Sequence, residues 1–65
     1  MELKNVLDYC VQSKKSAAIF MVNGYQIHGI VQSFDDDAIR VLNQENKTQV
    51  LLINNISTIT PPEGY

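Results

Sequence analysis

The chain has 65 residues, of which 45% are hydrophobic and 18% charged, a balance typical of one small folded domain rather than a disordered segment. Its longest unbroken apolar run, Ala17 to Val22, has six residues, whereas a bilayer-spanning helix needs about twenty. A membrane protein is therefore disfavoured, and we expect a cytoplasmic one. Five basic and seven acidic residues give a net charge of −2, which disfavours a nonspecific binder of duplex DNA.

Neither an intrachain disulfide nor a structural zinc site can stabilise this small chain. Its one cysteine, Cys10, cannot form an intrachain disulfide, and Cys10 with the one histidine, His28, cannot assemble a structural zinc site. A chain of this size hides only about 60% of its unfolded surface when it folds. We therefore expect self-association to supply the missing stability.

The first predicted element is an amphipathic helix over residues 2–13. Its apolar side chains recur at the spacing of one helical face, at Leu3, Val6, Leu7, Cys10 and Val11. Polar residues occupy the opposite face, so the helix is expected to pack on a core by one side.

After residue 15 the hydrophobic period changes to two, which predicts five short strands over residues 16–22, 25–34, 38–42, 49–53 and 56–60. Asn23-Gly24 is the strongest two-residue hairpin signal, and Gly29 predicts a bulge or sharp bend inside the second strand. Asp35-Asp36 marks the next turn, and residues 43–46 form a polar loop. The expected fold is mainly β, a small, strongly bent, five-stranded antiparallel barrel of the SH3-like kind behind one helix. Residues 1–60 form its single domain and residues 61–65 a short tail.

No enzyme signature is present in the sequence. It has no glycine-rich phosphate loop, no paired acid and base, and no metal-ligand spacing, so we expect neither catalysis nor a cofactor. The run Asp35-Asp36-Asp37 lacks the glycine and the distal glutamate of a calcium loop. A solvated acidic turn is the favoured interpretation, and weak divalent binding is a secondary one.

One set of motifs resembles a known family. The run from Phe20 to Gly29, Phe-Met-Val-Asn-Gly-Tyr-Gln-Ile-His-Gly, with Ser33-Phe34-Asp35 and Ile56-Ser57-Thr58, resembles bacterial Hfq, the Sm-like RNA chaperone family. The similarity covers residues 2–60. It implies a homo-oligomeric ring, typically a hexamer, in which neighbouring barrels join by strand addition, and it implies single-stranded RNA as the partner.

In the family, the distal face of the ring binds A-rich single strands. The resemblance places this face at Phe20, Gly24, Tyr25, Gln26, Ile27, His28, Gln49 and Thr58. Aromatic rings suit base stacking, a glutamine amide can read an adenine edge, and Gly24 would permit close backbone approach. Without the resemblance, ordinary packing would be the commoner role of Phe20 and Tyr25, and His28 is assigned at most an RNA contact.

The proximal face and the rim have largely lost the family pattern. The positions of the family's U-rich site hold Leu3, Asp36, Asp37, Leu52, Ile53 and Asn54. These residues remove the stacking aromatic and the cation and add two carboxylates, so we expect this site to be degenerate. The family's arginine cluster on the rim corresponds to Val11, Gln12 and Lys14, and with Lys15 beside them only a weak basic patch remains.

Two functions follow from this pattern. The first is an Hfq-like RNA chaperone that binds A-rich or purine-rich RNA on its distal face and acts in post-transcriptional regulation. The alternative is a ring scaffold that has exchanged RNA for a protein partner. Phe20, Tyr25 and Gln49 favour RNA, whereas the lost proximal and rim cations favour the scaffold.

Overall fold

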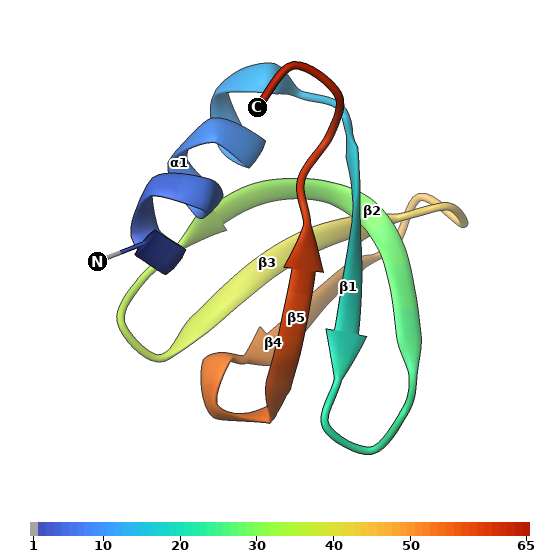
Figure 1. The fold of residues 1–65 in the computed structure, drawn as a ribbon. Coiled ribbons are helices and arrows are strands. Elements are labelled where there is room, and N and C mark those ends of the chain that lie inside the picture. Colours follow the sequence, from blue (N-terminus) through green and yellow to red (C-terminus); the bar gives the residue numbers. More distant parts are fainter. Residues whose placement is uncertain (1) are drawn as a thin grey trace.

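The structure, a computed structural model that describes residues 2–65, places a helix ahead of a five-stranded antiparallel sheet (Figure 1). The elements are α1 (Glu2–Ser13), β1 (Ser16–Met21), β2 (Gln26–Phe34), β3 (Ala38–Asn43), β4 (Thr48–Leu52), the 3-10 helix η1 (Ile53–Asn55) and β5 (Ile56–Thr60). The predicted helix and all predicted strands are confirmed, each bound to within one residue. No helix in the described part of the chain is long and apolar enough to cross a membrane.

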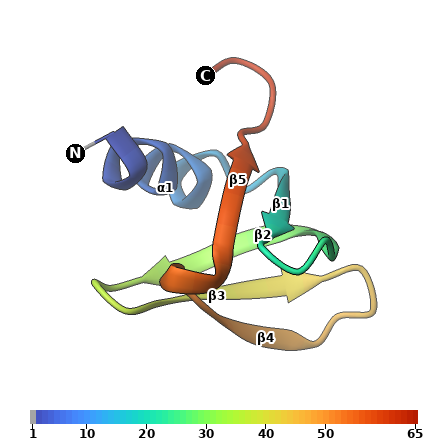
Figure 2. The same ribbon diagram turned by 60° about the horizontal axis from the view of Figure 1, so that its bottom comes forward.

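Helix α1 packs on the sheet through the face that its apolar periodicity predicts. Leu7 and Cys10 are fully buried, and the other apolar residues of the same face pack around them. The helix ends where Lys14 adopts a left-handed backbone conformation, with a φ of 57°. Figure 2 shows α1 on the β2 side of the sheet, away from β4, and among the strands its main contacts are with β2.

The strands are arranged in the order β4-β3-β2-β1-β5, and all neighbours are antiparallel. The long strand β2 curves across the molecule, so the sheet is strongly bent (Figure 1). Within residues 2–65, β4 and β5 do not pair with each other and remain the two edges of the sheet. The fold is therefore a bent, open barrel in which two strand edges are free for further pairing.

The sequence predicts either a bulge or a sharp bend at Gly29, and the bulge in β2 does not lie there. The register between β2 and β3 shifts between Val31 and Ser33, so the irregularity falls after Gly29. A Cβ atom at Gly29 would lie 2.5 Å from the carbonyl oxygen of Leu42 and 2.5 Å from Cγ1 of Val41. Glycine is needed here because β3 approaches β2 closely.

The backbone hydrogen bond between Met21 and Tyr25 closes a β1–β2 turn of three residues, 22–24, instead of the predicted two. The Gly24 N–H donates to the Met21 carbonyl at 3.0 Å, and the Met21 N–H donates to the Tyr25 carbonyl at 2.8 Å. Within this loop only Gly24 has a positive φ, 95°, whereas a two-residue type I′ turn needs two such residues. Asn23 contributes its side chain, because its Oδ1 accepts from the Tyr25 N–H at 3.1 Å.

The core consists of alternate strand residues together with the buried face of α1. Its members are Leu7, Cys10, Ala17, Ile19, Val31, Ile39, Val41 and Leu51. In β3, for example, Ile39 and Val41 are buried while Arg40 between them is exposed. Strand residues of the other parity therefore face away from the core, and this places Phe20 on the outer face of β1.

Residues 61–65 fold back against α1. Pro62 is buried, and the Tyr9 hydroxyl donates to the Glu63 carbonyl at 2.7 Å. The rings of Tyr9 and Tyr65 meet edge to face, with centroids 5.2 Å apart. The domain boundary after residue 60 stays a prediction, and the segment beyond it is part of the packed structure.

Candidate nucleic-acid interface

A row of side chains crosses β5, β1 and β2 on the face turned away from the core. Phe20 pairs with Thr58 of β5 and with Gln26 of β2, so the three side chains point to the same side of the sheet. Phe20 is half-buried, whereas Gln26 and Thr58 are exposed. The fold thus brings three of the predicted distal residues together.

The β1–β2 turn adds an exposed aromatic ring next to this row. Tyr25 follows Gly24 directly and is 72% exposed. A Cβ atom at Gly24 would meet nothing within 4 Å, so within this chain the glycine serves the positive φ and not a close approach. An aromatic ring in this position has a face available for stacking.

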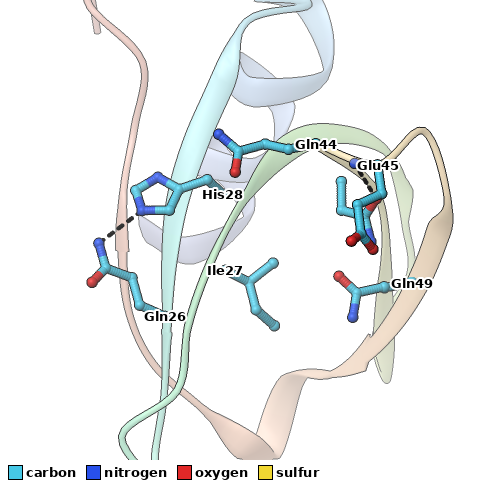
Figure 3. Close-up of a pocket in the computed structure, with 7 residues that line it drawn as sticks. Gln26, Ile27, His28, Gln44, Glu45 and Gln49 are labelled. Atoms are coloured by element: carbon cyan, nitrogen blue, oxygen red, sulfur yellow. Dashed lines mark hydrogen bonds between the residues drawn. The ribbon is translucent and has the colours of Figure 1, made fainter.

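A shallow depression of about 320 Å³ begins at Gln26 (Figure 3). It is lined by Gln26, Ile27, His28, Asn43, Gln44, Glu45 and Gln49. The Nε2 atoms of Gln26 and His28 lie 2.9 Å apart, in hydrogen-bond contact. Four predicted residues, Gln26, Ile27, His28 and Gln49, therefore share one depression. The other four, Phe20, Gly24, Tyr25 and Thr58, lie outside its lining.

The end of β3 and the β3–β4 loop supply three lining residues that sequence reasoning missed, Asn43, Gln44 and Glu45. Asn43 builds the loop, because its Oδ1 accepts from the N–H groups of Glu45 at 2.9 Å and Lys47 at 3.0 Å. Asn46 takes the left-handed conformation that closes it, with a φ of 63°. The pairing of Gly29 with Asn43 carries this loop to the start of β2. This pairing between strands, which brings the three residues to the depression, cannot be derived from the residue pattern alone.

The chemistry of the depression is that of amides and an imidazole. A glutamine side chain donates and accepts at once, which matches the N6–H and N7 edge of adenine. The only charged side chain in the lining is Glu45, and no cation contributes to it. A nucleic acid bound here would be held by stacking and hydrogen bonds more than by neutralised phosphates.

The positions predicted to form a degenerate U-rich site fall into two groups. Leu3, Asp36 and Ile53 line an apolar cleft of about 260 Å³ between α1, the end of β2 and η1, which we call the α1 cleft. Its remaining lining residues are Lys4, Leu7, Phe34 and Asp35. Asp37, Leu52 and Asn54 lie outside the lining and are exposed. Sequence reasoning found the loss of polar groups but not the apolar cleft.

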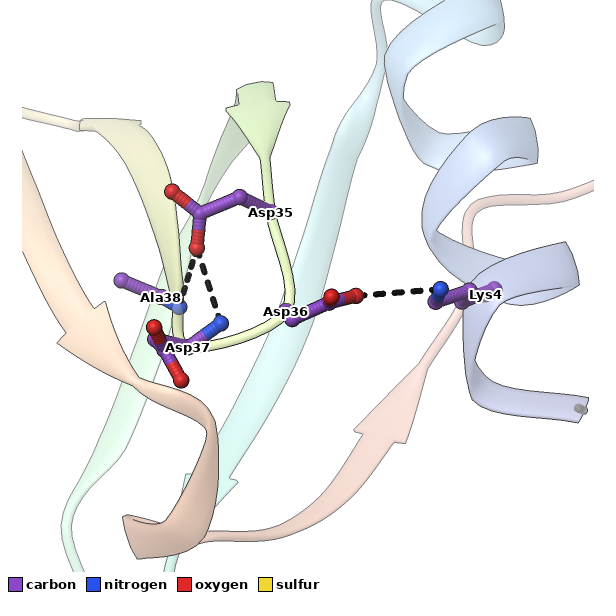
Figure 4. A network of polar contacts seen from close by, with 5 residues as sticks. All are labelled: Lys4, Asp35, Asp36, Asp37 and Ala38. Carbon is purple, nitrogen blue, oxygen red and sulfur yellow. Dashed lines mark hydrogen bonds and ion pairs between the residues drawn. The ribbon is translucent and has the colours of Figure 1, made fainter.

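The acidic β2–β3 turn is held by contacts within the chain (Figure 4). The Asp35 Oδ1 accepts from the N–H groups of Asp37 at 2.8 Å and Ala38 at 2.9 Å, and these hydrogen bonds lower the pKa of the Asp35 carboxyl. Asp36 pairs with the Lys4 ammonium at 3.0 Å. In residues 2–65, no group of three His, Cys, Asp or Glu side chains is placed to hold a metal ion.

The weak basic patch of the rim consists of Lys14 and Lys15, which follow α1 and are exposed. Val11 and Gln12 precede them on the last turn of the helix. The Lys15 N–H donates to the Ser13 hydroxyl at 3.3 Å. An RNA contact at this patch stays a prediction.

A family model described as Hfq protein matches residues 4–65. An RNA-binding protein Hfq of Natranaerobius thermophilus is 35% identical over 57 residues, which cover 88% of this chain and 67% of the relative. One of Exiguobacterium sibiricum is 34% identical over 61 residues, covering 88% and 72%.

Other matches cover a smaller part of the relative or have a lower sequence identity. A protein of the same name from Thermoanaerobacter sp. is 46% identical over 44 residues, which span 66% of this chain and only 50% of that relative. This chain thus matches about half the length of some curated relatives. A crystal structure of "the pleiotropic translational regulator, Hfq" superposes with a TM-score of 0.86 over 92% of this chain and 98% of that chain, at 22% identity, which confirms the fold. The family model spans nearly the whole chain and two relatives exceed 30% identity over most of it, so this chain belongs to the Hfq family.

Proposed function

We propose that this chain is a non-enzymatic RNA chaperone that binds A-rich or purine-rich single-stranded RNA at the expected distal positions, among them Phe20, Tyr25 and Gln49. It would act in post-transcriptional regulation in the cytoplasm. One observation carries the proposal: the depression that holds Gln26, His28 and Gln49 shares Gln26 with the row that contains Phe20 and Thr58. Side-chain amides for the base edge and rings for the base face are the two requirements of single-strand recognition.

The same proposal includes a homo-oligomeric ring, with six subunits as in the family pattern. It is supported by the two unpaired edges, β4 and β5, which can add to one another between neighbouring subunits. Val50 and Leu52 of β4 are 59% and 54% exposed, so the edge strand offers apolar surface that a neighbour would bury. Association would also supply the stability that a chain of this size lacks.

The proposed specificity favours adenine over uracil because the two ends of the molecule differ in chemistry. The α1 cleft, at the positions of the family's U-rich site, has apolar walls and two aspartates in its lining. Phosphates approaching those carboxylates are repelled, and no exposed aromatic ring lines the cleft for a uracil to stack on. We therefore propose that U-rich RNA binds weakly at this end.

The test is fluorescence anisotropy of the full chain with labelled oligoadenylate and oligouridylate of equal length, each at low and high salt. The proposal expects tight binding of oligoadenylate, much weaker binding of oligouridylate and a shallow salt dependence, because few lysines neutralise phosphate. Equal affinity for the two RNAs would overturn the proposed specificity. Failure to bind either RNA at low salt would overturn the RNA function and leave the protein scaffold in its place.

A further inference from the structure

We infer that the proton on His28 determines which base edge Gln26 reads, so that acid shifts the RNA preference of this chain from adenine toward guanine. This role of His28 rests on the proposed function, because it requires Gln26 to contact a base. Three features support it: the contact between the two side chains, the donor and acceptor pattern of an amide, and the absence of other ionisable groups from the strands around His28.

Gln26 and His28 are neighbours on one face of β2, because residues two apart on a strand point to the same side. The Gln26 Nε2 and the His28 Nε2 lie 2.9 Å apart (Figure 3). An amide nitrogen donates and does not accept, so the Gln26 N–H donates and the His28 Nε2 accepts. An accepting Nε2 belongs to a neutral imidazole that carries its proton on Nδ1. The contact therefore requires one charge state and one tautomer of His28.

In this arrangement the Gln26 amide keeps its Oε1 and one N–H for a ligand, because His28 uses the other N–H. A group that both donates and accepts fits the edge of adenine, where N7 accepts and N6–H donates. The neutral form of His28 thus leaves Gln26 with the pattern that adenine requires.

Protonation of His28 reverses this pattern. An imidazolium donates from both ring nitrogens, so its Nε2–H would point at the Gln26 N–H and the two donors would repel each other. Rotation of the amide by half a turn removes the conflict, because Oε1 then accepts from His28. The amide is left with N–H donors alone, which suit the edge of guanine, where N7 and O6 both accept.

The strands around His28 contain no other group that could cause such a change. His28 is exposed, and Ala18, its partner on β1, has no polar side chain. Strands β1, β4 and β5 have no ionisable side chain at all. The one in β3, Arg40, pairs with Ser33 near the far end of β2. Within the sheet, His28 is therefore the one ionisable group beside Gln26.

The flanking loops bring three further ionisable residues, Tyr25, Glu45 and Lys47. Among them only Glu45 lines the depression, and within residues 2–65 it forms no ion pair with His28. Histidine is the side-chain type that ordinarily changes charge between about pH 5 and 8. Its protonation would also place a cation in a lining whose charged side chain is otherwise a carboxylate, and this cation attracts phosphate.

The experiment measures fluorescence anisotropy of the full chain with labelled oligoadenylate and with a labelled AAG-repeat RNA of equal length, at about pH 8 and about pH 5.5. The ratio of the two affinities should favour oligoadenylate at the higher pH and fall about fivefold or more at the lower pH, because one hydrogen bond to the base changes its direction. His28→Gln keeps a polar side chain that takes up no proton, so its ratio should stay constant. Protonation of the RNA itself affects both proteins alike, so comparing parent and variant removes that effect.

Two further variants separate the amide from the charge. Gln26→Ala keeps the His28 cation but lacks the amide, so acid should strengthen the binding of both RNAs together without changing their ratio. Glu45→Gln is the matched control, because it removes the other ionisable side chain of the lining and should keep the shift of the parent.

A measurement without RNA tests the contact itself. His28 is the chain's one histidine, so its ring nitrogens are identified without ambiguity in 15N NMR spectra of the free protein. At about pH 8 the ring should carry its proton on Nδ1. The side-chain amide signal of Gln26 should shift as His28 takes up its second proton.

Three results would overturn this role of His28. They are an equal fall of the ratio in the parent and His28→Gln, loss of the shift in Glu45→Gln, and an Nε2–H tautomer in the free protein. Oligoadenylate binding with a ratio that does not change with pH overturns the role of His28 and leaves the RNA function standing. Absence of oligoadenylate binding at both pH values overturns the RNA function, and the base-reading role falls with it.

Discussion

Tyr25→Ala gives the sharpest test of the RNA interface, because it should change binding without changing the fold. The ring is 72% exposed, and the two hydrogen bonds of this residue in the turn use its backbone groups, which alanine keeps. An exposed substitution of this kind alters stability by less than about 0.5 kcal/mol. Stacking of a base on an aromatic ring contributes about 1–3 kcal/mol, so the affinity for oligoadenylate should fall about 5-fold to 150-fold per occupied pocket.

The assay is fluorescence anisotropy at low salt, with urea unfolding of the same samples at one protein concentration. Tyr25→Phe keeps the ring and should bind oligoadenylate like the parent. Tyr65→Ala is the matched control, because Tyr65 is also exposed, at 57%, but packs on Tyr9 beside α1. The reasoning is refuted if Tyr25→Ala binds as tightly as the parent, or if Tyr25→Phe loses as much affinity as Tyr25→Ala.

Four further outcomes are expected. Gln49→Ala should reduce the preference for adenine over other bases in competition experiments, with total affinity less affected, because an amide reads the base edge. Gly29→Ala should destabilise the fold by about 1–3 kcal/mol in urea titrations, since the added Cβ meets the Leu42 carbonyl; a change of a few tenths would contradict the close approach. The lowered pKa of Asp35 means that its charge stabilises the β2–β3 turn above pH 3.8 and that this contribution is lost as the pH falls further. Asp35→Asn should thus be less stable than the parent at neutral pH, and this difference in stability should shrink as the pH falls below 3.8. Sedimentation at micromolar concentration should give a ring of about six chains, and a stable monomer would contradict the role assigned to the strand edges.

The elements could be predicted from the sequence because each follows from a local pattern. The apolar spacing from Leu3 to Val11 defines α1, and alternation around Ile39 and Val41 defines β3. Turn geometry was harder to predict from the sequence. Asn23-Gly24 is compatible with loops of two or three residues, and only the backbone conformation of Asn23 decides between them.

Only part of the candidate site could be predicted from the sequence, because the rest depends on how the strands pair. Gln26, His28 and Gln49 could be named from the family resemblance, but their neighbours Gln44 and Glu45 depend on how β3 pairs with β2. That register includes an irregularity between Val31 and Ser33, which no residue type marks. The α1 cleft is lined by segments that lie far apart in the sequence. Such a site depends on tertiary packing, and no hydrophobic periodicity in the sequence indicates it.

The burial of Cys10 has a practical consequence for biophysical work. This residue is the chain's one cysteine, it is 0% exposed, and burial raises the pKa of its thiol. A protonated thiol inside the core reacts slowly with maleimides, because the thiolate is the reactive form. A cysteine introduced at an exposed position such as Lys47 would therefore take up a fluorophore or spin label selectively in the folded protein. Distances between labels on neighbouring subunits of the proposed ring could then be measured without replacing a core residue.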